Sequence, residues 1–139
     1  MKYKVYAGGY PLERAHFDDA GMDIRTPESF TLYPGHSIVI DTKVAVQIPV
    51  GYFGKLESKS GLNVNHSIIT TGGVVDSGFR GTIKVKLFNF GSETYMFHEG
   101  DKISQLVILP VLLCDLEQEE RLDDSESGRN ENGFGSTGR

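Results

Sequence analysis

Short runs of β-favouring residues, separated by glycine, proline, asparagine or aspartate, are the feature that most constrains how this chain can fold. The clearest run covers residues 82–87, where Ile, Val and Leu alternate with Thr and Lys. Because successive side chains of a strand point to opposite faces, this pattern indicates a strand with one buried face. The 3.6-residue apolar period of a helix is not sustained anywhere, and we expect at most one helical turn, after Ser60-Gly61-Leu62. The sequence therefore predicts an all-β subunit, built as a jelly roll or a β-sandwich.

All of the expected strands lie within the first 109 residues of the chain. Their ranges are 3–6, 37–40, 43–48, 52–57, 67–70, 82–90, 94–97 and 103–109. With 139 residues, the chain has the size of one domain.

Hydropathy and cysteine usage exclude two further classes of protein: those with a membrane-spanning helix and those stabilised by internal disulfides. The longest apolar stretch, residues 106–114, is interrupted by Pro110 and is far shorter than the ~20 residues that a membrane-spanning helix needs. The first residues contain no apolar signal-peptide run, and the single cysteine, Cys114, excludes an internal disulfide framework. We expect a soluble protein with no membrane association, located in the cytoplasm, or in the host cytoplasm if a virus encodes it.

The charge of the chain is negative and unevenly distributed. The net charge is −5, and seven acidic residues against one arginine lie between Asp115 and Glu126. A nucleic-acid-binding protein usually has a basic surplus, so direct nucleic-acid binding is not expected. The rest of the chain, with 12 acids and 13 bases, is close to neutral. Such a body can bind a polyphosphate if a metal ion shares the charge.

Composition divides the chain into three parts. Residues 1–115 form the β-rich core, residues 116–128 an acidic linker, and residues 129–139 a glycine-rich arm that carries one phenylalanine. The linker has too few apolar residues to form a core of its own. Fully extended, its 13 residues reach about 40 Å. From composition alone, the arm is either a disordered tail or a flap over a functional site.

Several familiar motifs fail in this chain. Residues 133–138 fit GxGxxG, but a dinucleotide-binding fold needs a strand before this motif and a helix after it. No Walker A loop or GxSxG elbow is present. The four histidines are at least 20 residues apart, so a zinc site is not expected.

Five segments combine glycine with a polar or charged residue. Their ranges are 20–24, 57–63, 72–81, 100–106 and the C-terminal arm. Within them, Lys59-Ser60-Gly61 offers a cation, a hydroxyl and exposed backbone N–H groups, which suit a phosphate. Asp76 lies between two valines and a glycine-rich turn. Its carboxylate is either a general base or a cap for the turn, and the local sequence leaves both interpretations open.

In this order, the five segments closely resemble the five motifs of the trimeric deoxyuridine triphosphatases, the dUTPases. GGVVDSGFRG is similar to the family's G-V-I-D-x-x-Y-R-G, and RNENGFGSTG to its R-G-x-G-G-F-G-S-T-G. The resemblance implies β-rich jelly-roll subunits assembled as a homotrimer, with each active site built from three chains. It also implies Mg²⁺-assisted attack of water on the α-phosphorus of dUTP, which gives dUMP and pyrophosphate. This reaction limits uracil incorporation into DNA and supplies dUMP for dTMP synthesis.

The resemblance implies roles for residues of the third segment. Asp76 corresponds to the carboxylate that meets the sugar 3′-OH and orients the attacking water as general base. Phe79 corresponds to the aromatic residue that packs on the deoxyribose and leaves no room for a 2′-hydroxyl. The hairpin around Gly73 and Lys84 is expected to present main-chain groups to the uracil edge, which would leave polar groups unpaired against cytosine.

The other segments are expected to hold the phosphates and the metal ion. Lys59, Ser60 and Gly61 correspond to the phosphate loop, and Gln105 to the amide that meets the α-phosphate. Asp23 corresponds to a carboxylate near the water shell of Mg²⁺. The arm residues expected to bind substrate are Arg129 at the γ-phosphate, Phe134 on the uracil, and Gly135, Ser136 and Thr137 around the phosphates.

The chain departs from the family pattern at a few positions. Lys59 stands where the family usually has arginine, so a bidentate phosphate contact is lost and a weaker grip is expected. Phe79 replaces the usual tyrosine, which keeps the stacking face but removes the hydroxyl. Lys102 and Ser104 replace the usual arginine and alanine and are expected to have structural roles. Residues 130–132 are more polar than the usual glycine-rich stretch, from which slower arm closure is expected.

Three other functions are compatible with parts of the sequence. A dCTP deaminase of related fold uses a glutamate on the strand after the hairpin, but residues 83–87 contain no acid. A nucleotide sensor or protein-interaction module on the same fold predicts dUTP binding without turnover. A plain β-sandwich binding domain leaves the arm unexplained.

Overall fold

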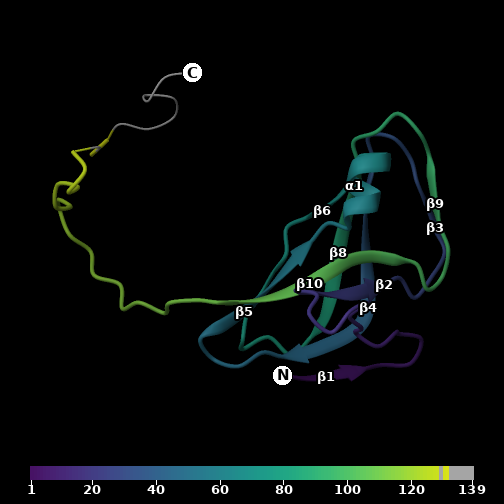
Figure 1. Ribbon diagram of the computed structural model, residues 1–139, viewed down its shortest axis with the longest axis horizontal. Coiled ribbons are helices and arrows are strands. Elements are labelled where there is room, and N and C mark those ends of the chain that lie inside the picture. The colour runs from purple at the N-terminus through teal and green to yellow at the C-terminus, as the bar shows by residue number, and fades with distance from the viewer. Residues whose placement is uncertain (129, 132–139) are drawn as a thin grey trace.

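The computed structural model describes residues 1–128, 130 and 131 and contains two antiparallel four-stranded sheets with a two-stranded ribbon (Figure 1). The first sheet has the order β1 (Lys2–Val5), β4 (Ser37–Gln47), β8 (Thr82–Asn89) and β6 (Ile68–Thr71). The second has the order β2 (Gly21–Arg25), β10 (Lys102–Pro110), β5 (Tyr52–Glu57) and β7 (Val74–Val75), and β3 (Phe30–Leu32) pairs with β9 (Tyr95–Phe97). The prediction of an all-β, sandwich-like subunit is confirmed.

The core contains the apolar faces of both sheets. In β8, Ile83, Val85 and Leu87 are buried, as their alternation predicts, whereas the lysines between them are exposed. Ile24 of β2 and Leu106 of β10 belong to the same cluster of buried side chains. Strands from both sheets contribute to this cluster. The hairpin before β8 and the loop after β5 are therefore anchored to the hydrophobic core.

Most expected strands are present with small shifts in their ends, and the differences have physical causes. The expected runs at 37–40 and 43–48 form one strand, β4, which continues through Lys43 with φ 60° and shifts its register to β8 there. β2 was not predicted, and its burial does not alternate, because Met22, Asp23 and Ile24 are all buried. β3 and β7 were missed because they are only three and two residues long.

The helix α1 (Ser60–His66) is longer than the single turn that the sequence predicts. Its sequence is mostly polar, but Leu62 is buried in the core and fixes the helix to the sheets. The helix ends at Ser67, whose φ of 55° is left-handed and whose N–H donates to the Leu62 and Asn63 carbonyls. Tertiary packing rather than helix propensity therefore sets its length.

The chain leaves the body of the subunit after β10 (Figure 1). The N–H of Val111 donates to the Gly51 carbonyl at 2.8 Å, and every residue from there to Gly128 is exposed. Leu112, Leu113 and Leu116 lie in this segment and are 85%, 66% and 97% exposed. We call residues 111–116 the apolar arm base. In the described part of the chain, no helix has the length and apolarity needed to cross a bilayer.

Candidate active site

Four of the predicted site residues line one cavity. Gly73, Asp76, Phe79 and Lys84 surround a hollow of about 410 Å³ beside the hairpin that joins β7 to β8. The cavity is completed by five residues to which the sequence assigned no role in binding: Leu56, Val74, Val75, Thr82 and Ile83. We call this hollow the hairpin cavity.

Glycine is required at the entrance of the hairpin. Gly73 has a φ of 118°, a conformation that side-chain-bearing residues rarely adopt, and its carbonyl accepts a hydrogen bond from Leu56 N–H at 2.8 Å. A Cβ at position 73 would lie 2.7 Å from the Leu56 Cβ. The hairpin backbone therefore lies against β5 at a distance that only glycine permits.

The turn after β7 leaves the carboxylate of Asp76 available. The turn is closed by backbone, since the N–H of Phe79 donates to the Asp76 carbonyl at 3.1 Å. Among the described residues, the Asp76 carboxylate has neither an ion-pair nor a hydrogen-bond partner, and the residue is exposed. Of the two interpretations that the sequence left open, this geometry favours a free carboxylate over a turn cap.

Phe79 presents its ring to the same cavity. The ring is 44% exposed, and Gly81 makes room for it, because a Cβ at position 81 would lie 2.7 Å from the Phe79 Cζ. An apolar ring beside an unpaired carboxylate and an exposed lysine can bind a ligand that has both a ring face and polar groups.

The residues predicted to bind phosphate belong to a second group, in which charged side chains already form ion pairs with one another. Asp23 accepts ion pairs from Lys59 Nζ at 2.5 Å and from Lys102 Nζ at 2.6 Å, and its side chain is only 5% exposed. Burial alone would raise the pKa of the Asp23 carboxyl, but hydrogen bonds from Lys102 and Lys59 outweigh it and hold the pKa below its ordinary value. The carboxylate is therefore ionised at neutral pH and neutralises part of the charge of both lysines.

The remaining members lie next to this ion-pair cluster. Gln105 is paired in register with Asp23 on one side and Glu57 on the other, and its Nε2 donates to the Ser58 carbonyl at 3.0 Å. Ser60 and Gly61 begin α1 and are exposed. We call Asp23, Lys59, Lys102, Gln105 and the start of α1 the cation cluster.

The two groups do not meet within one chain. None of the cation-cluster residues lines the hairpin cavity. The predicted arm residues Arg129, Phe134, Gly135, Ser136 and Thr137 lie outside the described residues.

Two residues of β10, Lys102 and Ser104, depart from the family pattern, and the side chains of both have polar partners in the chain. Lys102 shares Asp23 with Lys59, a role that the sequence did not indicate because 79 positions separate Lys102 from Asp23. Ser104 is buried and its hydroxyl donates to the Glu57 carbonyl at 2.9 Å, so its polar group is satisfied between β10 and β5.

The described residues do not form a protein-only metal site. They contain no group of three or more His, Cys, Asp or Glu side chains that could hold a metal ion. Asp23, the predicted contributor, is engaged by two ammonium groups. Mg²⁺ usually keeps several waters and binds through substrate phosphates with one or two carboxylates. The donor set therefore fits Mg²⁺ that arrives on a phosphate ligand and does not fit a resident ion.

Comparison with known proteins agrees with the motifs and the fold. A model of the dUTPase family matches residues 11–138. The deoxyuridine 5′-triphosphate nucleotidohydrolase of Anaeromyxobacter sp. (strain Fw109-5) is 42% identical over 141 residues, which cover 98% of this chain and 95% of that protein.

Solved structures give the same result. A mutant dUTPase of Staphylococcus bacteriophage 80alpha with dUpNHpp superimposes with a TM-score of 0.86 at 31% identity, covering 99% of this chain and 98% of that one. A mutant dUTPase from phage phi11 of S. aureus, described as coordinating a structural Mg(II) ion, has a TM-score of 0.80 at 31% identity over 86% of this chain and 96% of that one. Sequence motifs, fold and family match all agree, and the chain belongs to the dUTPase family.

Proposed function

We propose that this protein hydrolyses dUTP to dUMP and pyrophosphate. The observation that carries the proposal is the hairpin cavity, where Gly73, Asp76, Phe79 and Lys84 come together in a chain that belongs to the dUTPase family. The physiological result is a low dUTP level, which limits uracil in DNA, together with dUMP for dTMP synthesis. Because the substrate is a free nucleotide, we place the protein in the cytoplasm, or in that of the host if a virus encodes it.

The shape of the hairpin cavity supports selection of a deoxynucleoside with uracil. The Phe79 ring packs against the deoxyribose, where a 2′-hydroxyl would collide with it. The backbone near Gly73 is held against β5 by the Leu56 hydrogen bond, so it presents a fixed pattern of donors and acceptors. A fixed pattern that matches uracil leaves buried polar groups unpaired against cytosine, which is costly.

Asp76 is the general base of the proposed reaction. Its carboxylate takes a proton from the attacking water as the water oxygen bonds to the α-phosphorus. The bond from this phosphorus to the bridging oxygen breaks, and pyrophosphate leaves with that oxygen. Mg²⁺, where it is bound to the phosphates of the substrate, would share their negative charge.

The cation cluster binds the phosphates after an exchange of partners. Lys59 and Lys102 share one carboxylate, so Lys59 can turn to a phosphate while Lys102 still neutralises Asp23. Gln105 and the exposed Ser60 and Gly61 offer further donors. Asp23 would lie near the water shell of Mg²⁺ only once substrate has arrived, because before that both of its oxygens are paired with lysines.

We propose that the active unit is a homotrimer. Two observations support assembly: no residue of the cation cluster lines the hairpin cavity of the same chain, and the apolar arm base exposes three leucines. In a trimer, the hairpin cavity of one chain faces the cation cluster of a second, and residues 129–139 of a third close over both. Leu112, Leu113 and Leu116 are then covered by a neighbouring subunit.

The deciding experiment is pyrophosphate release measured with Mg²⁺ and, in turn, dUTP, UTP, dTTP and dCTP. We expect only dUTP to be used, and a chain that ends at Gly128 to lose most turnover while it still binds dUTP. Full turnover by the shortened chain would contradict the role of residues 129–139. Ammonia release from dCTP would establish a deaminase instead, and dUTP binding without pyrophosphate release would establish a sensor. Sedimentation at several concentrations tests the trimer.

A further inference from the structure

Two residues, Ser58 and Lys59, connect β5 to α1, and their position is not fixed by a helix cap. Lys59 is the N-cap of α1, but its side chain makes no capping hydrogen bond. The Lys59 ammonium pairs with Asp23 instead, and the proposed binding of a phosphate breaks this contact. The position of the connection therefore depends on its other neighbours.

A pair of hydroxyl groups, from Ser104 and Thr70, lies beside the start of this connection. The Ser104 side chain is fully buried, and its hydroxyl donates to the Glu57 carbonyl at 2.9 Å. The Thr70 hydroxyl donates to the Ser104 Oγ at 3.2 Å. Because Thr70 belongs to β6 and Ser104 to β10, the pair joins the two sheets where β5 ends.

Ser58 is held by the same two strands. The N–H of Thr70 donates to the Ser58 Oγ at 2.9 Å, and the Nε2 of Gln105 donates to the Ser58 carbonyl at 3.0 Å. Together with the bond from Ser104 to the Glu57 carbonyl, these contacts hold the backbone immediately before Lys59.

Ser104 is the member of this group that stands where the family usually has alanine. An alanine there can neither donate to the Glu57 carbonyl nor accept from Thr70. We propose that Ser104, supported by Thr70, is a positioning residue for phosphate binding, which holds the connection in place while the Lys59 ammonium leaves Asp23 for a phosphate. A connection that is already ordered loses less conformational entropy on binding, which favours affinity. The inference rests on the proposed function, in which the cation cluster binds the phosphates.

Binding of inorganic triphosphate in the presence of Mg²⁺, measured by titration calorimetry, tests the proposal without turnover. In Ser104→Ala, we expect the Kd for triphosphate to rise about 3–10-fold, which corresponds to the loss of one neutral hydrogen bond. The KM for dUTP should rise by a similar factor while kcat stays within about twofold, because the ground state and the transition state lose the same contact. An unchanged Kd would overturn the proposal.

Thr42 provides the matched control. Like Ser104, it is fully buried, its hydroxyl donates to a carbonyl at 2.9 Å, that of Ile83, and its oxygen accepts one further hydrogen bond, from Val44 N–H. It lies on β4, whereas the cation cluster is built on β2, β10 and the connection after β5. Thr42→Val should lose a similar amount of thermal stability and keep the Kd for triphosphate. An equal rise of the Kd in both variants would indicate a general loss of stability and overturn the proposal.

Two backbone amides report the position of the connection in the absence of any ligand. The N–H of Thr70 is bonded to Ser58 Oγ at 2.9 Å, and the N–H of Asn63 to the Lys59 carbonyl at 3.0 Å. In the alanine variant, we expect the hydrogen exchange of both amides, followed by NMR, to become about 3–10-fold faster. The amide of Gly35, hydrogen-bonded elsewhere at 2.8 Å, should keep its rate.

These exchange rates separate the inference from the proposed function. Unchanged rates would overturn the positioning role, whether or not dUTP is hydrolysed. Faster exchange with weaker triphosphate binding, in a protein that releases no pyrophosphate from dUTP, would support the positioning role and contradict hydrolysis alone.

A double variant tests whether Ser104 and Thr70 act as one unit. Thr70→Val removes only the hydroxyl that donates to Ser104, so we expect about a twofold rise in the Kd for triphosphate. Ser104→Ala/Thr70→Val should bind like Ser104→Ala, because the Thr70 hydroxyl acts through Ser104. Effects that multiply in the double variant would overturn the supporting role of Thr70.

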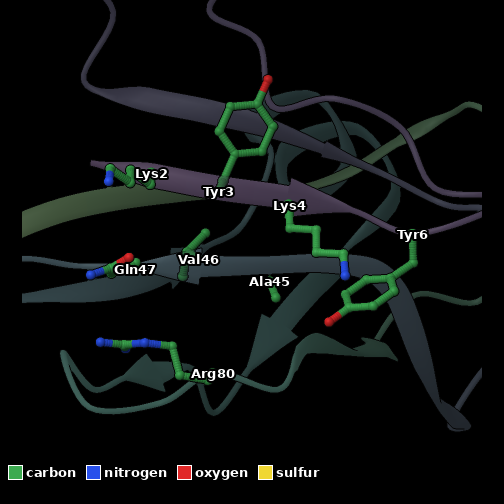
Figure 2. Close-up of a pocket in the computed structure, with 8 residues that line it drawn as sticks. All are labelled: Lys2, Tyr3, Lys4, Tyr6, Ala45, Val46, Gln47 and Arg80. Atoms are coloured by element: carbon green, nitrogen blue, oxygen red, sulfur yellow. The ribbon is translucent and has the colours of Figure 1, made fainter.

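A second group of cations provides the control for where triphosphate binds. Figure 2 shows a hollow of about 220 Å³ on the first sheet, where Lys2 and Lys4 lie across from Arg80. We call it the basic hollow. Within the described chain, none of these three cations pairs with a carboxylate, so triphosphate can bind there as well. In the background Lys2→Gln/Lys4→Gln, the effect of Ser104→Ala on the Kd should persist. Its disappearance would place the measured binding in the basic hollow and overturn the proposal.

Discussion

The hairpin cavity and the cation cluster differ in how their charged groups are satisfied before any ligand arrives. In the hairpin cavity, the Asp76 carboxylate is exposed and has no partner among the described residues, and the backbone around it is held rigidly by glycine and by β5. In the cation cluster, Asp23 is buried and carries two ion pairs. The hairpin cavity can therefore bind a ligand without breaking an existing contact, whereas in the cation cluster a lysine must leave Asp23 before it can bind a ligand.

Loss of the Asp76 carboxylate tests the first half of this contrast and has the largest expected effect. Asp76→Asn keeps the size of the side chain but removes the proposed general base, so we expect kcat for dUTP to fall about 10²–10⁴-fold with little change in thermal stability. Initial rates of pyrophosphate release measure the effect. Asp18→Asn, at another exposed carboxylate, serves as the control and should have normal rates. A loss below tenfold in Asp76→Asn would assign the base to another residue.

Removal of the Phe79 ring tests the shape of the cavity. Phe79→Ala opens space beside the sugar, so we expect the preference for dUTP over UTP, as a ratio of kcat/KM, to fall about 10–100-fold. Phe79→Tyr keeps the ring and is expected to keep the preference. If Phe79→Ala discriminated as well as the original protein, the ring would not be what excludes the 2′-hydroxyl.

The Asp23 ion pairs test the second half of the contrast through stability. Asp23→Asn removes the charge that two lysines share, and we expect the free energy of unfolding at pH 7 to fall by about 2 kcal/mol. Asp41→Asn is the control, because Asp41 also has a lowered pKa, chiefly from the Lys43 backbone N–H, but is far more exposed. Its loss should be smaller in urea titrations.

Folding lowers the pKa of Asp23, and the direction of this shift determines how the stability difference between the original protein and Asp23→Asn depends on pH. The pKa of Asp23 is lower in the folded chain, so the unfolded chain binds its proton first as the pH falls. The stabilisation is complete well above the ordinary aspartate pKa of about 3.9 and is lost as the pH falls through the lower folded value. The original protein and Asp23→Asn should therefore converge in acid, and a constant gap down to the acid-unfolding region would contradict the ion-pair account.

The smallest expected effect concerns Lys59. Lys59→Arg restores a planar fork that can hold Asp23 and a phosphate together, so we expect the KM for dUTP to fall a few-fold while kcat stays within about twofold. Steady-state kinetics over dUTP concentration separate the two constants. Unchanged kinetics would mean that this contact does not limit phosphate binding.

The hairpin cavity was predictable because its parts are neighbours in the chain. Gly73, Asp76 and Phe79 lie within seven residues, and the alternation of residues 82–87 places Lys84 on the strand that follows. The cation cluster was predictable only in part. Its ion pairs join β2, β10 and the loop after β5, and no local pattern reports which lysines meet Asp23 across that distance.

Burial explains the other differences between expectation and structure. In β2, Met22, Asp23 and Ile24 are all buried, whereas Gly21 and Arg25 at its ends are partly exposed, so burial does not follow the apolar and polar residues of the strand. α1 extends past its expected turn because Leu62 is buried. The basic hollow was not expected either, because Arg80 joins Lys2 and Lys4 only through tertiary structure.

The exposed leucines of the apolar arm base have a consequence for how the protein is made. A newly folded subunit exposes Leu112, Leu113 and Leu116 to solvent, and its strand β1 is an open edge of the first sheet. In a subunit that is not yet part of the proposed homotrimer, these two features favour aggregation with other partly folded chains. If the proposed homotrimer forms, its rate of assembly then sets how long these leucines stay exposed to aggregation.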